Sequence, residues 1–286
     1  MAAGLLLAAV ALGGLERLRP AVAGRRLARA GLRTDLAYWF FTPLVTRWVT
    51  RAAVVVAVVL LAAGAGVPLD RAHLQAFVAG GGSAVQAQPV WMQTLEVLLL
   101  GDLIGYGMHR AFHRGRWWRF HAVHHSSREV DWLSSVRLHP LNDVAMRLAQ
   151  VVPFVLLGFN PALVAAYAPF LTVHALLLHA NVPWTFGPLR FLVSSPAFHR
   201  WHHTTEAEGL DKNFAGLFPF IDLALGTFYM PPGRQPQRFG ILGGEVPEGL
   251  WAQLRYPFLG EGAVSVTAPE LPAAPASAPA PPAPPR

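Results

Sequence analysis

Histidine is the residue type in this chain whose number and spacing most clearly indicate chemistry. Eleven of the twelve histidines lie between residues 109 and 203. Most of them belong to one HxxxH motif and two later HxxHH motifs. Side chains three or four residues apart share one face of a helix, so each motif presents several imidazoles in one direction. The motif residues are His109 and His113, then His121, His124 and His125, and finally His199, His202 and His203.

These spacings predict a centre with two transition-metal ions. Imidazole suits iron, zinc, copper and nickel, and one such ion takes about four to six ligands. The clustered histidines exceed the needs of one ion. Adjacent histidines in an HxxHH motif point in different directions, so each motif can supply both ions. The chain has no cysteine, which excludes thiolate ligands, disulfides and cysteine-ligated iron–sulfur clusters.

Three further histidines lie near the motifs. His179 is at the end of an apolar run beside Asn181, and we expect it to be a ligand. His174 lies five residues earlier, more than one helical turn deeper, so its ring either joins the same site or faces elsewhere. His139 precedes a proline in a loop, which favours a structural role or a hydrogen bond to a ligand ring.

Polar residues around the motifs are candidates for orienting the ligand rings. Asp102 and Tyr106 precede His109 and His113 at helical spacing, so the four residues form one stripe. Asp102 lies within an apolar run, where an ionisable side chain is expensive and usually functional. Hydrogen bonds from such residues fix the orientation of ligating imidazoles; the alternative is a polar belt at the membrane interface. Further candidates are Asn181, Asp211, Asn213 and Asp222.

The composition predicts that lipid surrounds much of the molecule. Hydrophobic residues make up 53% of the chain and charged residues 14%, against about a quarter in soluble domains. Apolar runs occupy residues 2–15, 52–67, 90–106, 144–159 and 162–178. The first is short for a bilayer span, which takes about 20 residues. We therefore expect an all-α integral membrane bundle of about four to five spans.

Charge placement predicts the orientation of the bundle. Arginines between residues 17 and 33 place that loop in the cytoplasm by the positive-inside rule. The glycine-rich residues 68–89 are then an outside loop, and every histidine motif lies at the cytoplasmic side. Residues 183–259 are expected to form a cytoplasmic histidine-rich helical cap. The formal charge of +7 comes from arginines that flank apolar runs, which favours a membrane surface over nucleic acid as the partner.

Three regions are predicted along the chain. Residues 1–89 hold the N-terminal spans and the outside loop, and residues 90–260 form the catalytic domain. Residues 261–286 are mostly proline and alanine, a composition that is typical of disorder.

The order of the motifs resembles that of the fatty acid hydroxylase/sterol desaturase superfamily over roughly residues 95–230. Asp102 and Tyr106 ahead of the first motif fit the same pattern. The segments that carry the resemblance are HRAFH at 109–113, WRFHAVHHSS at 118–127, RLHP at 137–140, HANV at 179–182, PAFHRWHH at 196–203, DKNF at 211–214 and DLALGT at 222–227.

The resemblance implies a membrane enzyme of the bacterial inner membrane or the endoplasmic reticulum; we expect the bacterial inner membrane, with the active site on its cytoplasmic side. It also implies a centre of two iron ions, with zinc as a substitute in isolated protein, that uses O2 to hydroxylate or desaturate a membrane lipid such as a sterol or fatty acyl chain. No electron-transfer motif accompanies the histidines, so a separate reductase, ferredoxin or cytochrome is expected as donor. The implied ligands are His109, His113, His121, His124, His125, His174, His179, His199, His202 and His203.

Two other classes of protein use the same ligand type. A zinc-dependent membrane hydrolase is one, although the chain has no HExxH motif and no carboxylate within the histidine motifs. A non-catalytic metal-binding membrane protein is the other. It predicts histidines along the spans, whereas these lie at their ends.

Overall fold

The computed structural model describes residues 2–24, 28–80 and 82–259, and these residues form an all-helical fold. Within those ranges no strand is present, and a single antiparallel bridge joins Thr204 to Phe239. This confirms the predicted all-α class; the predicted tail, residues 261–286, lies outside the described residues. The α-helices are α1 (Ala2–Leu18), α2 (Leu32–Phe41), α3 (Arg47–Gly64), α4 (Arg71–Val78), α5 (Val90–Phe112), α6 (Trp118–His125), α7 (Pro140–Leu157), α8 (Pro161–His179), α9 (Pro196–His202), α10 (Pro219–Ala224) and α11 (Leu250–Arg255).

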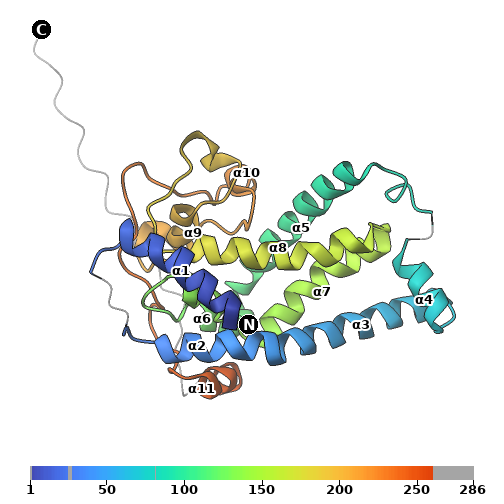
Figure 1. The fold of residues 1–286 in the computed structure, drawn as a ribbon, viewed down its shortest axis with the longest axis horizontal. Helices are drawn as coiled ribbons and strands as arrows, with labels where there is room; N and C mark the ends of the chain where they lie inside the picture. The colour runs from blue at the N-terminus through green and yellow to red at the C-terminus, as the bar shows by residue number, and fades with distance from the viewer. Residues whose placement is uncertain (1, 25–27, 81, 260–286) are drawn as a thin grey trace, which may run out of the picture.

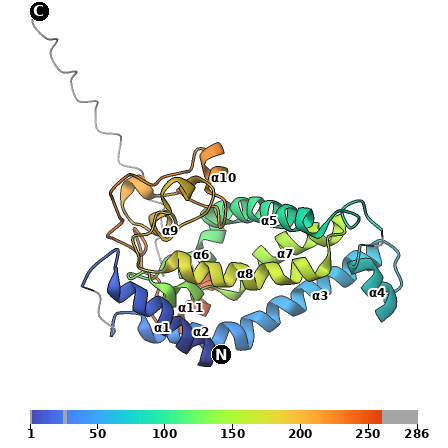
Figure 2. The same ribbon diagram turned by 45° about the horizontal axis from the view of Figure 1, so that its top comes forward.

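Four long helices form the body of the molecule. α3 packs along α7, and α5 packs against both α7 and α8. All four run between the same two ends, with α4 at one end and α6, α9, α10 and α11 at the other (Figures 1 and 2). α5 and α8 finish, and α7 begins, at the end that carries α6 and α9. This arrangement brings chain segments far apart in sequence to one end of the bundle.

Turn residues explain the hairpin that joins α7 to α8. Gly158 ends α7 in the left-handed conformation, with φ of 76°, which glycine adopts without strain. The side chain of Asn160 accepts a hydrogen bond from the Ala162 N–H at 2.9 Å, and Pro161 occupies the first helical position. The result is the tight turn that the sequence predicts.

The helix that contains α3 begins much earlier than the second apolar run predicts. α2, a π-helical segment (Thr42–Thr46) and α3 form one continuous helix, Leu32–Gly64, rather than starting near residue 52. Pro43 lacks the backbone N–H that a regular helical turn needs, which accounts for the π-helical segment around it. Polar residues lower the hydropathy of this part of the helix. One of them is Thr50, which is buried and donates a hydrogen bond to Asp143.

Three helices are long and apolar enough to cross a membrane, in the part of the chain that the structure describes. They are Leu32–Gly64, Pro140–Leu157 and Pro161–His179. α5 has 23 residues, but Gln93, Glu96 and Asp102 reduce its hydropathy and it is not among the three. Few residues of these three helices are buried, and large apolar side chains such as Val55 and Val173 are exposed. Exposed apolar surface on this scale is typical of contact with lipid.

The interior between α5, α7 and α8 is filled by an apolar cluster. Val97, Phe154, Phe159, Tyr167 and Leu217 form its buried core. Gly101 lets α8 approach closely, since a Cβ there would lie 2.5 Å from the Tyr167 hydroxyl. This packing fixes the long helices relative to one another and so fixes the end where the histidines lie.

Candidate metal centre

The structure brings nine histidines together in two adjacent groups. Within each group, one ring nitrogen per residue lies within 4.8 Å of all the others. The rings of His125 and His203, one from each group, stack with centroids 4.4 Å apart. The first group is His109, His113, His121, His125 and His202, and the second group is His124, His179, His199 and His203.

Each HxxHH motif divides its rings between the two groups. On α6, His121 and His125 belong to the first group and His124 to the second. On α9 the assignment reverses, because His202 belongs to the first group, while His199 and the following His203 belong to the second. Residues four apart share a helix face and their neighbours do not, so this division follows from helical geometry.

The Nε2 atoms converge within each group. In the first group the separations are 3.0 Å for His109–His121, 3.2 Å for His121–His125 and 3.1 Å for His125–His202. In the second group they are 3.3 Å for His124–His179, 3.2 Å for His179–His199 and 3.1 Å for His199–His203. Nitrogens about 2.1 Å from one ion, at angles between octahedral and tetrahedral, are about 3.0–3.4 Å apart.

The outer ring nitrogens show why these Nε2 atoms fit a cation. In five rings Nδ1 lies 2.8–2.9 Å from a carbonyl or amide oxygen, which can only accept, so Nδ1 carries the proton and Nε2 keeps a lone pair. Lone pairs that face one another repel unless a positive ion lies between them. The pairs are His109 with Phe214, His121 with Asn142, His124 with Arg137, His179 with Ala175 and His202 with Lys212.

Burial keeps these imidazoles neutral, which is the form that binds metal. Loss of solvation is the largest cause of a lowered pKa throughout the centre, and neighbouring imidazoles add to it. The pKa of His124 falls to about 4. The pKa values of His121, His125, His199, His202 and His203 lie well below 6.5.

His174 is the predicted ligand that the structure does not bring to either group. Its ring stacks on Phe170, one turn earlier on α8, with centroids 6.2 Å apart. The five-residue separation from His179 turns its ring away, which was one of the two alternatives that its spacing left open. His139, also left open, caps α7: its Nδ1 accepts from the Leu141 N–H and its Nε2 donates to the Leu254 carbonyl, both at 3.2 Å.

The predicted orienting residues Asp102 and Asp222 act on the loop over residues 211–227, which lies beside the first group. Asp102 accepts hydrogen bonds of 2.7–3.0 Å from the backbone N–H groups of residues 216, 217 and 218. Asp222 accepts from the Phe214 and Ala215 N–H groups at 2.8 Å. Phe214 supplies the carbonyl that holds His109. Both carboxylates are thus one step removed from the imidazole: they fix the loop whose carbonyl orients His109.

Two further predicted residues support the same loop. The Tyr106 hydroxyl donates to Thr227 at 3.0 Å, and Thr227 in turn donates to Asp222 at 2.6 Å. Asn213 is fully buried and donates to the carbonyls of Phe198 and Tyr229. The loop is therefore fixed from three directions, which fixes the carbonyls that receive His109 and His202.

The remaining two predicted residues have different partners. Asp211 lies 3.2 Å from Nδ1 of His113 and makes the one direct carboxylate–imidazole contact of the centre among the described residues. Asn181 instead exchanges hydrogen bonds of 3.0 Å with the backbone of Val22, in the N-terminal segment. It follows His179 by two residues and anchors the chain there.

Three residues that contribute to the centre were not predicted. Asn142 holds His121, Arg137 supplies the carbonyl for His124, and Asp35 binds the Arg137 guanidinium. Asn142 follows the HP dipeptide by two residues, which places it in the first turn of a helix that begins close to the histidine motifs. This position could have identified it as a candidate partner of a ligand ring. A backbone carbonyl and an ion pair between residues 102 positions apart leave no pattern in one sequence.

Comparison with known proteins identifies the part of the chain that carries this centre. The sequence model of the fatty acid hydroxylase family matches residues 94–227. The match spans all nine grouped histidines and the loop that supports them. This match and the relatives below fit the fatty acid hydroxylase/sterol desaturase superfamily, as the motifs predict.

Several named proteins are similar in sequence to this chain. Ornithine lipid hydroxylase OlsE of Rhizobium tropici is 33% identical over 176 residues, 61% of this chain and 53% of the relative. Alkylglycerol monooxygenase of Caenorhabditis elegans is 26% identical over 149 residues, 52% of this chain and 29% of the relative. The Danio rerio alkylglycerol monooxygenase is 29% identical, over 59% of this chain and 37% of the relative. The chain thus spans about half of the first relative and about a third of the others, and no solved structure matches it.

Proposed function

We propose that this protein is a membrane enzyme that hydroxylates or desaturates a lipid with O2 at a centre of two iron ions. The first and second histidine groups would each hold one ion. When bound, the pair of ions supplies the reduction of O2 and the oxidation of an unactivated C–H bond. The relatives named for ornithine lipid and alkylglycerol hydroxylation support a lipid substrate.

The observation that carries this proposal is the convergence of Nε2 lone pairs in two adjacent groups. A single ion would leave one of the two sets of facing lone pairs uncompensated. Ligands that are all imidazole suit iron as well as zinc. The stacked rings of His125 and His203 place the two groups side by side, which suits two ions that act on one O2 molecule.

The protein's own residues would bind the two ions, orient the ligand rings and shield the centre from water. The grouped imidazoles stay neutral through burial. The side chain of His113 is 8% exposed, and His199 and His203 are 7% and 2% exposed. Carbonyl and amide oxygens fix the ring planes before metal binds, so little reorganisation is needed. Exclusion of water from the groups protects reactive species from side reactions.

The membrane setting supports the choice of substrate. The three candidate spans and the histidine groups belong to the same bundle, and α8 ends at His179 in the second group. A lipid can therefore approach the centre without leaving the bilayer. We place the enzyme in the bacterial inner membrane with the centre at the cytoplasmic side, where a separate reductase, ferredoxin or cytochrome would deliver electrons.

The test is a metal and turnover analysis of anaerobically purified protein. We expect two iron ions per chain, O2 uptake that depends on an added electron donor, and a hydroxylated or desaturated lipid in extracts of producing cells. A matched His202→Ala variant should lack both uptake and product. Zinc-dependent hydrolysis of a lipid without O2 uptake would instead establish the hydrolase, and an unchanged lipid profile in a deletion strain would contradict a lipid-oxidising role.

A further inference from the structure

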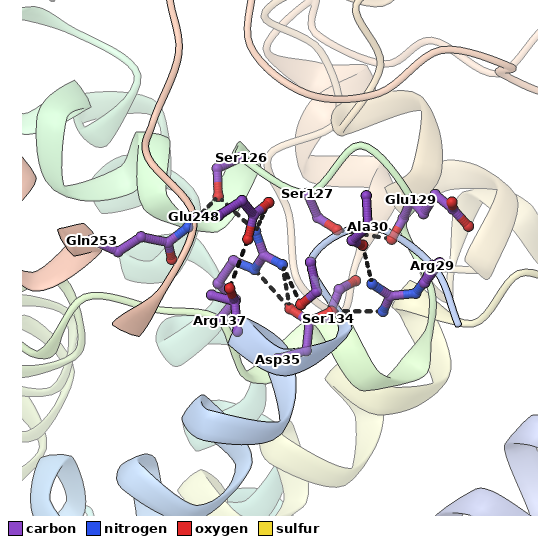
Figure 3. A network of polar contacts seen from close by, with 12 residues as sticks. Arg29, Ala30, Asp35, Ser126, Ser127, Glu129, Ser134, Arg137, Glu248 and Gln253 are labelled. Carbon is purple, nitrogen blue, oxygen red and sulfur yellow. Dashed lines mark hydrogen bonds and ion pairs between the residues drawn. The ribbon is translucent and has the colours of Figure 1, made fainter. Parts of the chain in front are cut away.

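A buried ion-pair network joins the N-terminal segment to the loop after α6 (Figure 3). Asp35, on α2, accepts from Nε of Arg137 at 2.7 Å and from Arg29 at 2.6 Å. Arg29 also binds both carboxylate oxygens of Asp131, at 2.6 and 2.7 Å. Asp35 and Arg137 are fully buried. Arg137 also lies 3.6 Å from the carboxylate of Glu248, whose side chain is 54% exposed. Two arginines thus face three carboxylates, and Asp35 is the one that is fully buried.

Arg137 connects this network to a ligand of the second group. Its backbone carbonyl accepts the Nδ1 proton of His124 at 2.9 Å. Its guanidinium also donates to Ser126 at 3.1 Å and to the Gly31 carbonyl at 3.2 Å. A Cβ at Gly31 would lie 2.5 Å from the guanidinium, so the close approach depends on glycine there. The side chain of Arg137 therefore fixes the position of the carbonyl that orients His124.

A second contact joins the N-terminal segment to the same group. Asn181, two residues after His179, is bound by the backbone of Val22 on both its amide atoms. Glu16 accepts from the Asn181 N–H at 2.8 Å and from the Trp132 N–H at 3.0 Å. The segment before residue 94, outside the family match, therefore contacts both chain regions that present His124 and His179.

A stabilising role alone is a poor explanation for these buried charges. Taking two opposite charges out of water costs about as much as their attraction returns, and apolar replacements are often as stable. Fixed geometry is what such a network does supply. The first group has no comparable link to residues 16–35 in the part of the chain that the structure describes; the loop over residues 211–227 and Asn142 hold it.

We propose that Asp35 is a positioning residue for metal binding at the second group, acting through Arg137 and His124. This inference rests on the proposed two-ion centre. Loss of the Asp35 charge leaves the Arg137 guanidinium with the exposed Glu248 carboxylate 3.6 Å away. The carbonyl of Arg137 can then shift, and His124 loses its fixed ring plane. The first group keeps its own hydrogen-bond partners, so its ion should bind as before.

The experiment uses the full chain in detergent, stripped of metal and titrated with Zn²⁺ against a chelator. Wild type should bind two ions, and Asp35→Asn should bind one normally and the other roughly 10- to 100-fold more weakly. To identify which histidine group is affected, Asp35→Asn is combined with a variant that lacks one ligand of the first or the second group. In a His202→Ala background, Asp35→Asn should weaken the remaining site; in a His203→Ala background it should not.

Two further variants separate positioning from folding. Gln93→Ala removes a buried side chain whose hydrogen bonds to Gln88 and Asn160 lie at the opposite end of α5, and it should lower the melting temperature but keep both ions. Asp35→Asn/Arg137→Gln also removes the buried guanidinium that has lost its buried carboxylate partner, so it should regain melting temperature without regaining the second ion's affinity.

The outcomes distinguish this inference from the proposed function. If wild type binds two ions and Asp35→Asn binds both with unchanged affinity, the inference alone fails. It also fails if the double variant recovers the second ion's affinity together with its melting temperature. If wild type binds fewer than two ions, the two-ion centre fails and the inference fails with it.

Discussion

The first and second histidine groups share two helices but are held by different parts of the chain. In the first group, residues 211–227 supply the partners of His109, His113 and His202. In the second group, Arg137 and Ala175 supply the partners of His124 and His179, and the N-terminal segment secures the chain around them. The two groups should therefore respond to different outer substitutions, although their ligands are chemically identical.

Exposure also differs between the groups. The first group meets the surface at Asp211, whose side chain is 75% exposed beside His113. The second group contains four buried rings. In the first group, water therefore screens the charge of a neighbouring side chain. In the second group, the interactions of the rings with their neighbours are not screened by water.

The largest effect expected is from removal of one ligand in each group. His202→Ala should remove the first ion and His203→Ala the second, each reducing turnover by more than the roughly 100-fold that loss of an outer hydrogen-bond partner costs. Metal analysis should give about one ion per chain in each variant. Two ions retained in either variant would contradict the division of the HxxHH motifs. His174→Ala serves as the control, because its ring lies outside both groups.

Acidification tests the burial that both groups share. In metal-free protein the pKa of His124 is about 4, against 6.5 when unfolded, so only the unfolded chain takes up this proton between those values. Stability therefore rises with pH in this window, and it falls by about 3 kcal/mol for His124 alone as pH drops from 6.5 to 4. Denaturant unfolding at several pH values measures the slope. A metal-free protein equally stable at pH 4.5 and 7 would show that the rings are solvated.

Asn142→Ala tests the outer partner of the first group. The change removes the oxygen 2.9 Å from Nδ1 of His121. It should lower the affinity of the first group for its ion by about 10-fold or more and leave the affinity of the second group unchanged. Zn²⁺ titration of metal-free protein measures both affinities. Asn160→Ala is the matched control, because it removes a helix cap at the opposite end of the bundle and should leave both ions in place.

Asp211→Asn should give the smallest effect. The carboxylate contacts His113 directly, but its side chain is 75% exposed, and a hydrogen bond to a neutral ring contributes only about 0.5–1.5 kcal/mol. We expect less than a fivefold change in the affinity of the first ion, measured by the same titration. If Asp211→Asn lowered the affinity as much as Asn142→Ala, an exposed partner of a ligand ring would matter as much as a buried one.

Local spacing predicted much of the centre. Residues i, i+3 and i+4 around His121 and His199 follow helix geometry, and this alone predicts that each motif serves two directions. The all-helical fold followed from apolar runs, and the α7–α8 turn followed from residues 160–161. These features depend on residues that are close together along the chain, so a single sequence is enough to predict them.

Features that depend on long-range packing were not predicted. The early start of the helix at Leu32 is hidden because Asp35 and Thr50 are polar, yet both are buried and hydrogen-bonded. The partner of His124 is a carbonyl, which every residue has, so no residue type marks it. The sequence marks Asp102 as a residue that could orient a ring, but it does not show that its partners are three backbone N–H groups of a distant loop.

The division of the HxxHH motifs has a consequence for the order in which the protein matures. The first group needs His202, and the second needs His199 and His203, so neither is complete until the ribosome has passed residue 203. α6 and α9 have eight and seven residues, too few to be stable helices alone in water. Each bound ion would then tie these two helices together across more than seventy residues of chain. Metal insertion in the cell would therefore follow the integration of α8 and would complete folding at this end.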